Sequence, residues 1–264
     1  MIEVLGIFMK RIILIILFVI SACDRRDSIP TGVPVSKSLL EYVNESYFLN
    51  LKTAPLALAY RNQNLSSGDT VNAISVIFMP AAYSAEYKYF ETASANIDTL
   101  DFSLFNERSP TEDTLYNGYL SKFIRSATDK DIWCRITFET YFDLYISSAV
   151  IIKSSNYSTV YEPDLVNIDL SDGTHPFFSW TNDTIPGNNI YLQLISDASD
   201  NLISGTFTHD KYFQFYDLSN VIINISPTPP DPILEPYKTY KFILMGIGKN
   251  NWVNLISERY FTTR

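Results

Sequence analysis

The ten residues DIWCRITFET, at positions 131–140, carry the clearest structural pattern in this chain. Alternation gives one face to Ile132, Cys134, Ile136 and Phe138 and the other face to Trp133, Arg135, Thr137 and Glu139. A period of two is typical of a β-strand, in which successive side chains point to opposite sides. The pattern predicts a strand whose apolar face enters a core, with Cys134 as a small buried hydrophobe and not a nucleophile.

Similar short runs, rich in β-branched and aromatic residues, recur along the chain from residue 70 to residue 257. A helical pattern occurs in SLLEYVNESYFLNL, residues 38–51, where Ser38 and Glu41 have the spacing of a capping box. Regular strands without intervening helices favour antiparallel sandwiches over a parallel α/β sheet. The predicted fold class is therefore all-β, with two antiparallel immunoglobulin-like β-sandwiches after a signal and a tether.

The N-terminal segment has the three parts of a secretory signal. Lys10 and Arg11 precede the nine apolar residues 12–20, and two small residues follow. Nine residues are too few to cross a bilayer, which needs about 20 in a helix. The stretch Ile20-Ser21-Ala22-Cys23 resembles the bacterial lipobox. That resemblance implies cleavage before Cys23, acylation of its thiol and a lipid anchor in the bacterial cell envelope, with the outer membrane as the expected location. An ordinary signal peptide that ends beside a cysteine is the alternative.

The C-terminal part resembles a fibronectin type III domain. The run FFSW ends at Trp180, and LEPYKTY places Leu234, Pro236 and Tyr240 at the spacing of the family's turn and tyrosine corner. The family usually has Thr where this chain has Lys238. The resemblance implies that Trp180 fills the core and that the Tyr240 hydroxyl closes the corner by a hydrogen bond.

A segment with few apolar runs, residues 154–176, separates the strands into two groups. The predicted organisation is a signal peptide over 1–22, a tether with a short helix over 23–44, an immunoglobulin-like sandwich over 45–162 and a fibronectin type III-like sandwich over 163–264.

Composition argues against several function classes. The net charge of −9 makes the chain a poor candidate for binding nucleic acid, whose affinity depends on Lys and Arg. The chain lacks Gly-x-Ser-x-Gly. Of its two histidines, His175 precedes Pro176 in the predicted linker and His209 precedes Asp210 in a predicted hairpin, so neither is expected to be catalytic. The clusters DLSDG, 169–173, and DASDN, 197–201, suit turns better than calcium loops. We expect no catalytic residue, no cofactor and no metal, and hence not an enzyme.

Binding is the function that the sequence favours. The chain has 18 Tyr, 17 Phe and 3 Trp, and aromatic faces stack on sugar rings. Under the fibronectin resemblance, the loops 181–189 and 246–255 meet at one end of the second sandwich. Their predicted ligand contacts are Trp252, Asn250, Asn251, Asp183 and Asn188, unless Trp252 simply begins the last strand and packs inward.

Trp133 is a second candidate contact, on the face of its strand opposite Cys134. The predicted function is a membrane-anchored, non-catalytic envelope lipoprotein that binds polysaccharide. The alternative is a structural or assembly subunit that binds another envelope protein through sheet edges or aromatic patches.

Overall fold

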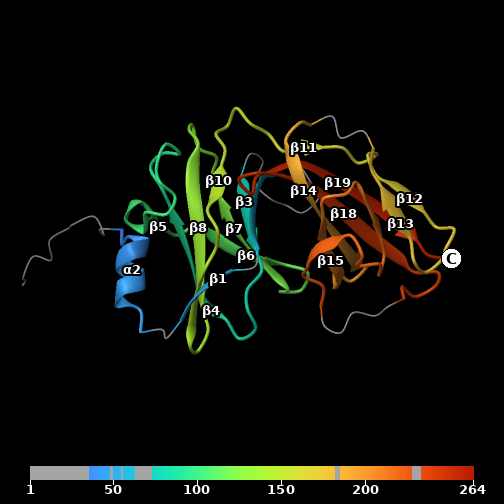
Figure 1. The fold of residues 1–264 in the computed structure, drawn as a ribbon, viewed down its shortest axis with the longest axis horizontal. Helices are drawn as coiled ribbons and strands as arrows, with labels where there is room; N and C mark the ends of the chain where they lie inside the picture. Colours follow the sequence, from blue (N-terminus) through green and yellow to red (C-terminus); the bar gives the residue numbers. More distant parts are fainter. Residues whose placement is uncertain (1–35, 48–49, 55, 63–72, 182–184, 228–232) are drawn as a thin grey trace, which may run out of the picture. The chain divides into compact units, whose positions relative to one another are not determined.

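Strands make up nearly all of the regular structure, which confirms the all-β prediction (Figure 1). The structure, a computed structural model, describes residues 36–264 except 48–49, 55, 63–72, 182–184 and 228–232. The predicted signal, most of the tether and the predicted lipid attachment site at Cys23 lie outside the described residues. Within the described part of the chain, no helix is long and apolar enough to cross a membrane.

The first sandwich has two sheets that face each other. The larger sheet has the order β1-β9-β8-β4-β5, with β10 also paired to β8, and the smaller has the order β2-β3-β7-β6. The larger sheet is formed by β1 (Asn50–Thr53), β4 (Ala85–Glu91), β5 (Asn106–Arg108), β8 (Ile132–Glu139), β9 (Asp143–Ile146) and β10 (Val150–Ile152). The smaller is formed by β2 (Ala57–Arg61), β3 (Ile74–Phe78), β6 (Thr111–Leu115) and β7 (Leu120–Arg125).

The alternation of β8 is confirmed. Cys134, Ile136 and Phe138 are fully buried between the two sheets, where Phe138 stacks on Phe78 with ring centroids 6.2 Å apart. The other face of β8 is also covered, because Arg135 lies over the rings of Phe102 and Phe105.

A short helix covers that outer face beside a 3-10 turn. The helix α2 (Leu39–Glu45) begins at Ser38 with the predicted capping box, in which Ser38 and Glu41 exchange hydrogen bonds. Leu39 packs with Phe90 and Phe105 beside the 3-10 turn η1 (Phe102–Leu104). The helix predicted at the end of the tether is therefore packed on the first sandwich.

The second sandwich places a small sheet against a large one. The small sheet has the order β12-β13-β16, and the large sheet has the order β11-β19-β18-β14-β15-β17. The small sheet consists of β12 (Asn167–Asp169), β13 (Phe177–Ser179) and β16 (Tyr212–Gln214). The large sheet consists of β11 (Val160–Tyr161), β14 (Asn188–Asp197), β15 (Leu202–Thr208), β17 (Val221–Asn224), β18 (Thr239–Gly248) and β19 (Val253–Thr262).

Strand direction follows the sequence expectation with two exceptions. The pairings among the described strands are antiparallel apart from β1 with β9 and β11 with β19, which are parallel. Strand β11 belongs to the predicted first domain, 45–162, yet Val160 pairs with Leu255 of the second sandwich. The chain thus enters the second sandwich before the predicted boundary.

Local features that the fibronectin resemblance implies are present in the second sandwich. Trp180 is 1% exposed and lies 5.3 Å from Tyr191, measured between ring centroids. The Tyr240 hydroxyl accepts a hydrogen bond of 2.9 Å from the Glu235 backbone N–H, which closes the predicted corner. Phe178 stacks on Phe242 across the core, with centroids 4.0 Å apart.

Cys134 gives a direct test of the core. Its thiol is fully buried, and burial raises the pKa of the thiol to about 12. Because the thiolate is the reactive form, we expect no alkylation of folded protein by iodoacetamide at pH 8, and complete alkylation in 6 M guanidinium. Mass spectrometry measures the extent of alkylation, and a Cys23→Ser variant is used so that Cys134 is the one cysteine that can react. Labelling of native protein at the rate of a free thiol would contradict the burial of β8.

Candidate functional site

The hairpin between β18 and β19 joins the second sandwich to the first. The Asn250 carbonyl accepts a hydrogen bond from the Ile151 N–H, and the Asn251 carbonyl accepts one from the Ala59 N–H, both at 3.0 Å. The Asn251 side chain donates to the Ser148 hydroxyl at 3.0 Å. The tip of this hairpin is therefore a structural contact with both sheets of the first sandwich.

Trp252 follows the tip and is 2% exposed. Its ring packs in the core cluster that includes Ala59, Ile74 and Val150 of the first sandwich. The structure contradicts its predicted place on an exposed contact surface, because the hairpin inserts the indole into the core of the first sandwich. The alternative of inward packing is correct, although the neighbours come from the other sandwich.

The remaining predicted contacts do not assemble into one open surface. Asn188 accepts a hydrogen bond of 3.0 Å from Asn254, and Asn251 holds the hairpin in place. Asn250 is exposed, and Asp183 lies outside the described residues. Trp133 is half-buried and donates from Nε1 to the Ala95 carbonyl at 2.9 Å.

A buried arginine fixes the connection between the sandwiches. Arg61 is 5% exposed and donates from Nε to the Tyr157 carbonyl at 2.8 Å. Its Nη2 donates to the carbonyls of Ser154 at 2.9 Å and Lys153 at 3.3 Å. The guanidinium thus holds the segment that leaves β10 and leads to β11.

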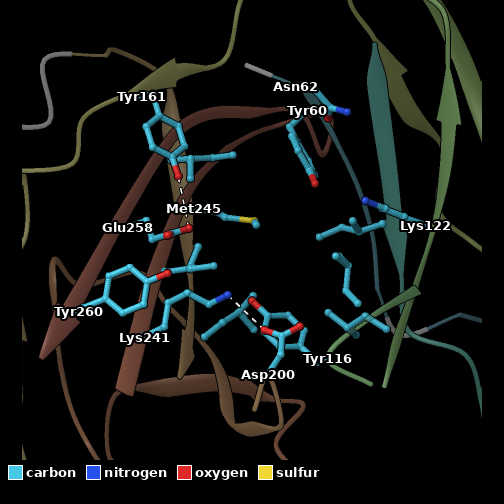
Figure 2. A pocket seen from close by; sticks show the side chains of 16 residues that line it. Tyr60, Asn62, Tyr116, Lys122, Tyr161, Asp200, Lys241, Met245, Glu258 and Tyr260 are labelled. Carbon is cyan, nitrogen blue, oxygen red and sulfur yellow. Dashed lines mark hydrogen bonds and ion pairs between the residues drawn. The ribbon is translucent and has the colours of Figure 1, made fainter. Parts of the chain in front are cut away.

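A cavity of about 250 Å³ lies between the sandwiches, and we call it the inter-sandwich cavity (Figure 2). Strands β2, β3, β6 and β7 line it on one side, and β11, β14, β18 and β19 line it on the other. The apolar lining residues are Ile77, Leu115, Leu120, Leu194, Ile243, Met245 and Ile256. The aromatic and polar ones are Tyr60, Asn62, Tyr116, Lys122, Tyr161, Asp200, Lys241, Glu258 and Tyr260.

Strand periodicity explains how the second sandwich supplies its wall. Lys241, Ile243 and Met245 alternate with Phe242 and Leu244, which point into that sandwich's own core. Both faces of strand β18 are therefore covered, one by the core of the second sandwich and the other by the inter-sandwich cavity. The continuous apolar run KFILMGI carries this signal, since strands covered on both faces lack polar alternation.

The polar groups of the cavity are arranged in pairs. The Tyr161 hydroxyl donates to Glu258 at 3.4 Å, and Lys241 forms an ion pair with Asp200 at 3.1 Å. Lys122, whose side chain is 5% exposed, forms an ion pair of 3.2 Å with Asp113. Burial, followed by the nearby Glu258 carboxylate, raises the pKa of Tyr161 well above its usual range, so its hydroxyl stays neutral.

Asn62 differs from these paired groups. It is 3% exposed, and neither its Oδ1 nor its Nδ2 has a hydrogen-bond partner among the described residues. Its backbone N–H donates to the Ala73 carbonyl at 2.8 Å, which fixes the residue at the end of β2. An unpaired buried carboxamide is unfavourable in the free protein and is a position at which a ligand can supply partners.

The cavity continues into an open hollow of about 400 Å³. The two share Asp200, Lys241 and Tyr260, and Tyr260 is 64% exposed. A ligand can therefore place one unit in the cavity and extend past Tyr260 toward solvent.

The other polar clusters are local turns. The Asp197 carboxylate accepts hydrogen bonds from the backbone N–H groups of Ser199 and Asn201, at 2.8 and 2.9 Å. Asp169 accepts one from Ser171 in the same way. Among the residues that the structure describes, no three His, Cys, Asp or Glu side chains gather as a metal site would require.

The two histidines lie in separate places. Nδ1 of His175 is 3.3 Å from the Asp172 carboxylate, and Nδ1 of His209 is 2.8 Å from the Asn189 carbonyl.

Comparison with known proteins gives only weak structural likenesses. No protein family and no curated protein matches the chain. Solved structures that resemble it include the FN1–FN3 domains of chicken CNTN1, with a TM-score of 0.28, 11% identity and coverage of 80% of this chain and 64% of that chain. A two-domain fibronectin type III segment of chicken tenascin has a TM-score of 0.29, 13% identity and coverage of 75% and 95%. The assignment of two immunoglobulin-like sandwiches rests on the strand order and the buried residues described above.

Proposed function

We propose that this chain is a non-catalytic binding module whose ligand site is the inter-sandwich cavity. One observation carries the proposal: a cavity at the junction of two sandwiches combines an apolar floor, four tyrosines and a few buried polar groups. Ligand sites in proteins have this composition and occur preferentially at domain interfaces. The volume of about 250 Å³ lies just below the usual range of about 300 to 1,000 Å³ for such sites, so the cavity suits one small unit of a larger ligand.

The ligand class that we propose is a polysaccharide. Tyrosine rings offer flat faces for the C–H groups of a sugar, and their neutral hydroxyls exchange hydrogen bonds with sugar hydroxyls. The open hollow beyond Tyr260 provides room for neighbouring sugar units. The lipobox supports an acylated Cys23 as the membrane anchor, so we place the module on the outer membrane of a bacterial cell envelope.

Calorimetric titration of the full-length protein in detergent with a panel of oligosaccharides tests this proposal. We expect saturable binding by one class and a three- to tenfold weaker affinity in Tyr260→Ala, because the exposed ring supplies a stacking face. Tyr47→Ala is the matched control, since Tyr47 is fully exposed and lies after α2, away from the cavity. The absence of binding across the panel would overturn the proposal.

A second function, assembly with another envelope protein, is supported by exposed aromatic side chains on the first sandwich. Tyr141 and Phe142, in the turn between β8 and β9, are 88% and 56% exposed and pack edge to face at 4.6 Å. A site-specific photocrosslinker at Tyr141 on intact cells distinguishes the two functions. One discrete crosslinked partner, together with no oligosaccharide binding, would favour assembly.

A further inference from the structure

We infer that Glu258 makes the inter-sandwich cavity select sugars without negative charge, so that uronic acids and sulfated sugars are excluded from it. This inference rests on the proposed function and names the class of sugar that the cavity accepts. Glu258 lies on β19, is half-buried and lines the cavity. Figure 2 shows its carboxylate between Tyr161 and Tyr260, two of the four tyrosines in the lining.

The two lysines in the lining are each paired with a carboxylate other than Glu258. Lys241 forms an ion pair with Asp200 at 3.1 Å, and Lys122 forms one with Asp113 at 3.2 Å. None of the cations that the structure describes forms an ion pair with Glu258. Two positive and three negative side chains leave one uncompensated negative charge, and it lies on Glu258. Because the site is partly buried, solvent screens this charge less than it would at an open surface.

Strand register explains why Lys241 does not neutralise Glu258. Lys241 on β18 pairs with Tyr260 on β19, and Glu258 lies two residues before Tyr260 on the same face. Lys241 is therefore a diagonal neighbour of Glu258, and its ammonium extends to Asp200 in the turn after β14 (Figure 2). The same ammonium is 5.9 Å from the centroid of the Tyr116 ring. These contacts hold the lysine charge where the cavity meets the open hollow.

The chemistry of a carboxylate defines which groups can bind beside Glu258. An ionised carboxylate donates no hydrogen bond and has about four acceptor positions, so it requires ligand groups that donate. The Tyr161 hydroxyl donates to it at a long distance of 3.4 Å, and other acceptor positions remain. Sugar hydroxyls can fill them with charge-assisted hydrogen bonds. A ligand carboxylate or sulfate has no proton to donate at neutral pH and places a second negative charge beside the first, which weakens binding.

The tyrosines on either side of Glu258 show how far its charge acts. Burial first, and then the Glu258 carboxylate, raises the pKa of Tyr161 above its usual value, and the same two causes raise the pKa of Tyr260. The negative charge therefore disfavours an anionic tyrosine on both sides. By the same electrostatics it disfavours an anionic ligand between them.

A matched pair of oligosaccharides tests this inference. The first is the neutral hexose oligosaccharide of the panel that binds most tightly, and the second is the same compound after oxidation of its primary hydroxyls to carboxylates. In calorimetry with the full-length protein in detergent, we expect the neutral form to bind at least about tenfold more tightly. We expect Glu258→Gln, which keeps the size of the side chain and an acceptor for Tyr161 but removes the charge, to reduce this difference to about threefold or less.

Two further variants separate the charge of Glu258 from other causes. Glu235→Gln is the matched control, because it changes the net charge by the same amount at a side chain that is 72% exposed and does not line the cavity. Tyr161→Phe removes the hydroxyl that donates to Glu258 and leaves the charge in place. We expect both variants to keep the full preference for the neutral form. Circular dichroism checks that each variant is folded.

The outcomes separate this inference from the proposed function. Equal or tighter binding of the oxidised form by the unaltered protein overturns the exclusion of anionic sugars. An undiminished preference in a folded Glu258→Gln protein overturns the role of Glu258. Both results leave carbohydrate binding standing, whereas failure of every oligosaccharide in the panel overturns the proposed function itself.

Discussion

Replacing Trp252 with alanine is expected to lower the free energy of unfolding by about 3 to 5 kcal/mol, the range for loss of a large buried aromatic side chain. The indole is 2% exposed and belongs to the core cluster of the first sandwich, although Trp252 is part of the second sandwich's hairpin. The substitution therefore removes the packing that anchors the second sandwich's hairpin in the core of the first sandwich. Guanidinium unfolding followed by circular dichroism measures the change.

The shape of the guanidinium unfolding curve shows in addition whether the two sandwiches unfold together. Because the indole anchors the second sandwich's hairpin in the core of the first sandwich, we expect Trp252→Ala to broaden the transition or divide it into two steps, as sandwiches that separate before they unfold would do. Asn250→Ala is the control at the same hairpin tip, since Asn250 holds the first sandwich through its backbone carbonyl and its side chain is exposed. That variant should stay within about 0.5 kcal/mol of the parent. A loss below about 1 kcal/mol in Trp252→Ala would contradict the role of the indole as a buried anchor in the first sandwich.

Trp252 also shows why local sequence patterns predict the strands and turns correctly but do not predict how the two sandwiches contact each other. The alternation in β8, the capping box at Ser38 and the corner at Tyr240 each depend on residues a few positions apart, so the sequence predicts them correctly. The neighbours of Trp252 depend instead on how one sandwich meets the other. No spacing within the hairpin encodes that orientation, and an aromatic residue beside a polar tip fits either an exposed contact or an anchor.

The inter-sandwich cavity could not be predicted from the sequence either, because it also depends on how the two sandwiches meet. Its walls come from eight strands and the turns between them, and residues as distant as Tyr60 and Tyr260 line it together. The one sequence signal was the unbroken apolar run in β18, which indicates a strand covered on both faces and so a partner for the sheet's outer side. Asn62 had no such signal, because an asparagine at the end of a strand is typical of a turn.

Replacing Arg61 with methionine is expected to cost about 3 kcal/mol or more, since its guanidinium donates to three backbone carbonyls in a buried place. Burial lowers the pKa of this guanidinium, yet an arginine keeps its charge at every physiological pH, so the donors are always present. Methionine retains most of the packing and none of the donors. Arg259→Met is the matched control, because Arg259 is 37% exposed on its side chain and its ion pair with Asp164 should contribute at most about 1 kcal/mol.

The Arg61 variant should also weaken ligand binding, although Arg61 does not line the cavity. Tyr60 and Asn62 are the sequence neighbours of Arg61, and both line the cavity. The Arg61 side chain points the other way, to the segment that connects β10 and β11. Loss of the three hydrogen bonds frees the end of β2 and with it the position of the Asn62 carboxamide. We therefore expect Arg61→Met to lose affinity for the oligosaccharide, whereas Arg61→Lys, which keeps one donor group, should retain part of it. Full affinity in a folded Arg61→Met protein would show that ligand binding in the cavity does not depend on the hydrogen bonds from Arg61 to the connecting segment.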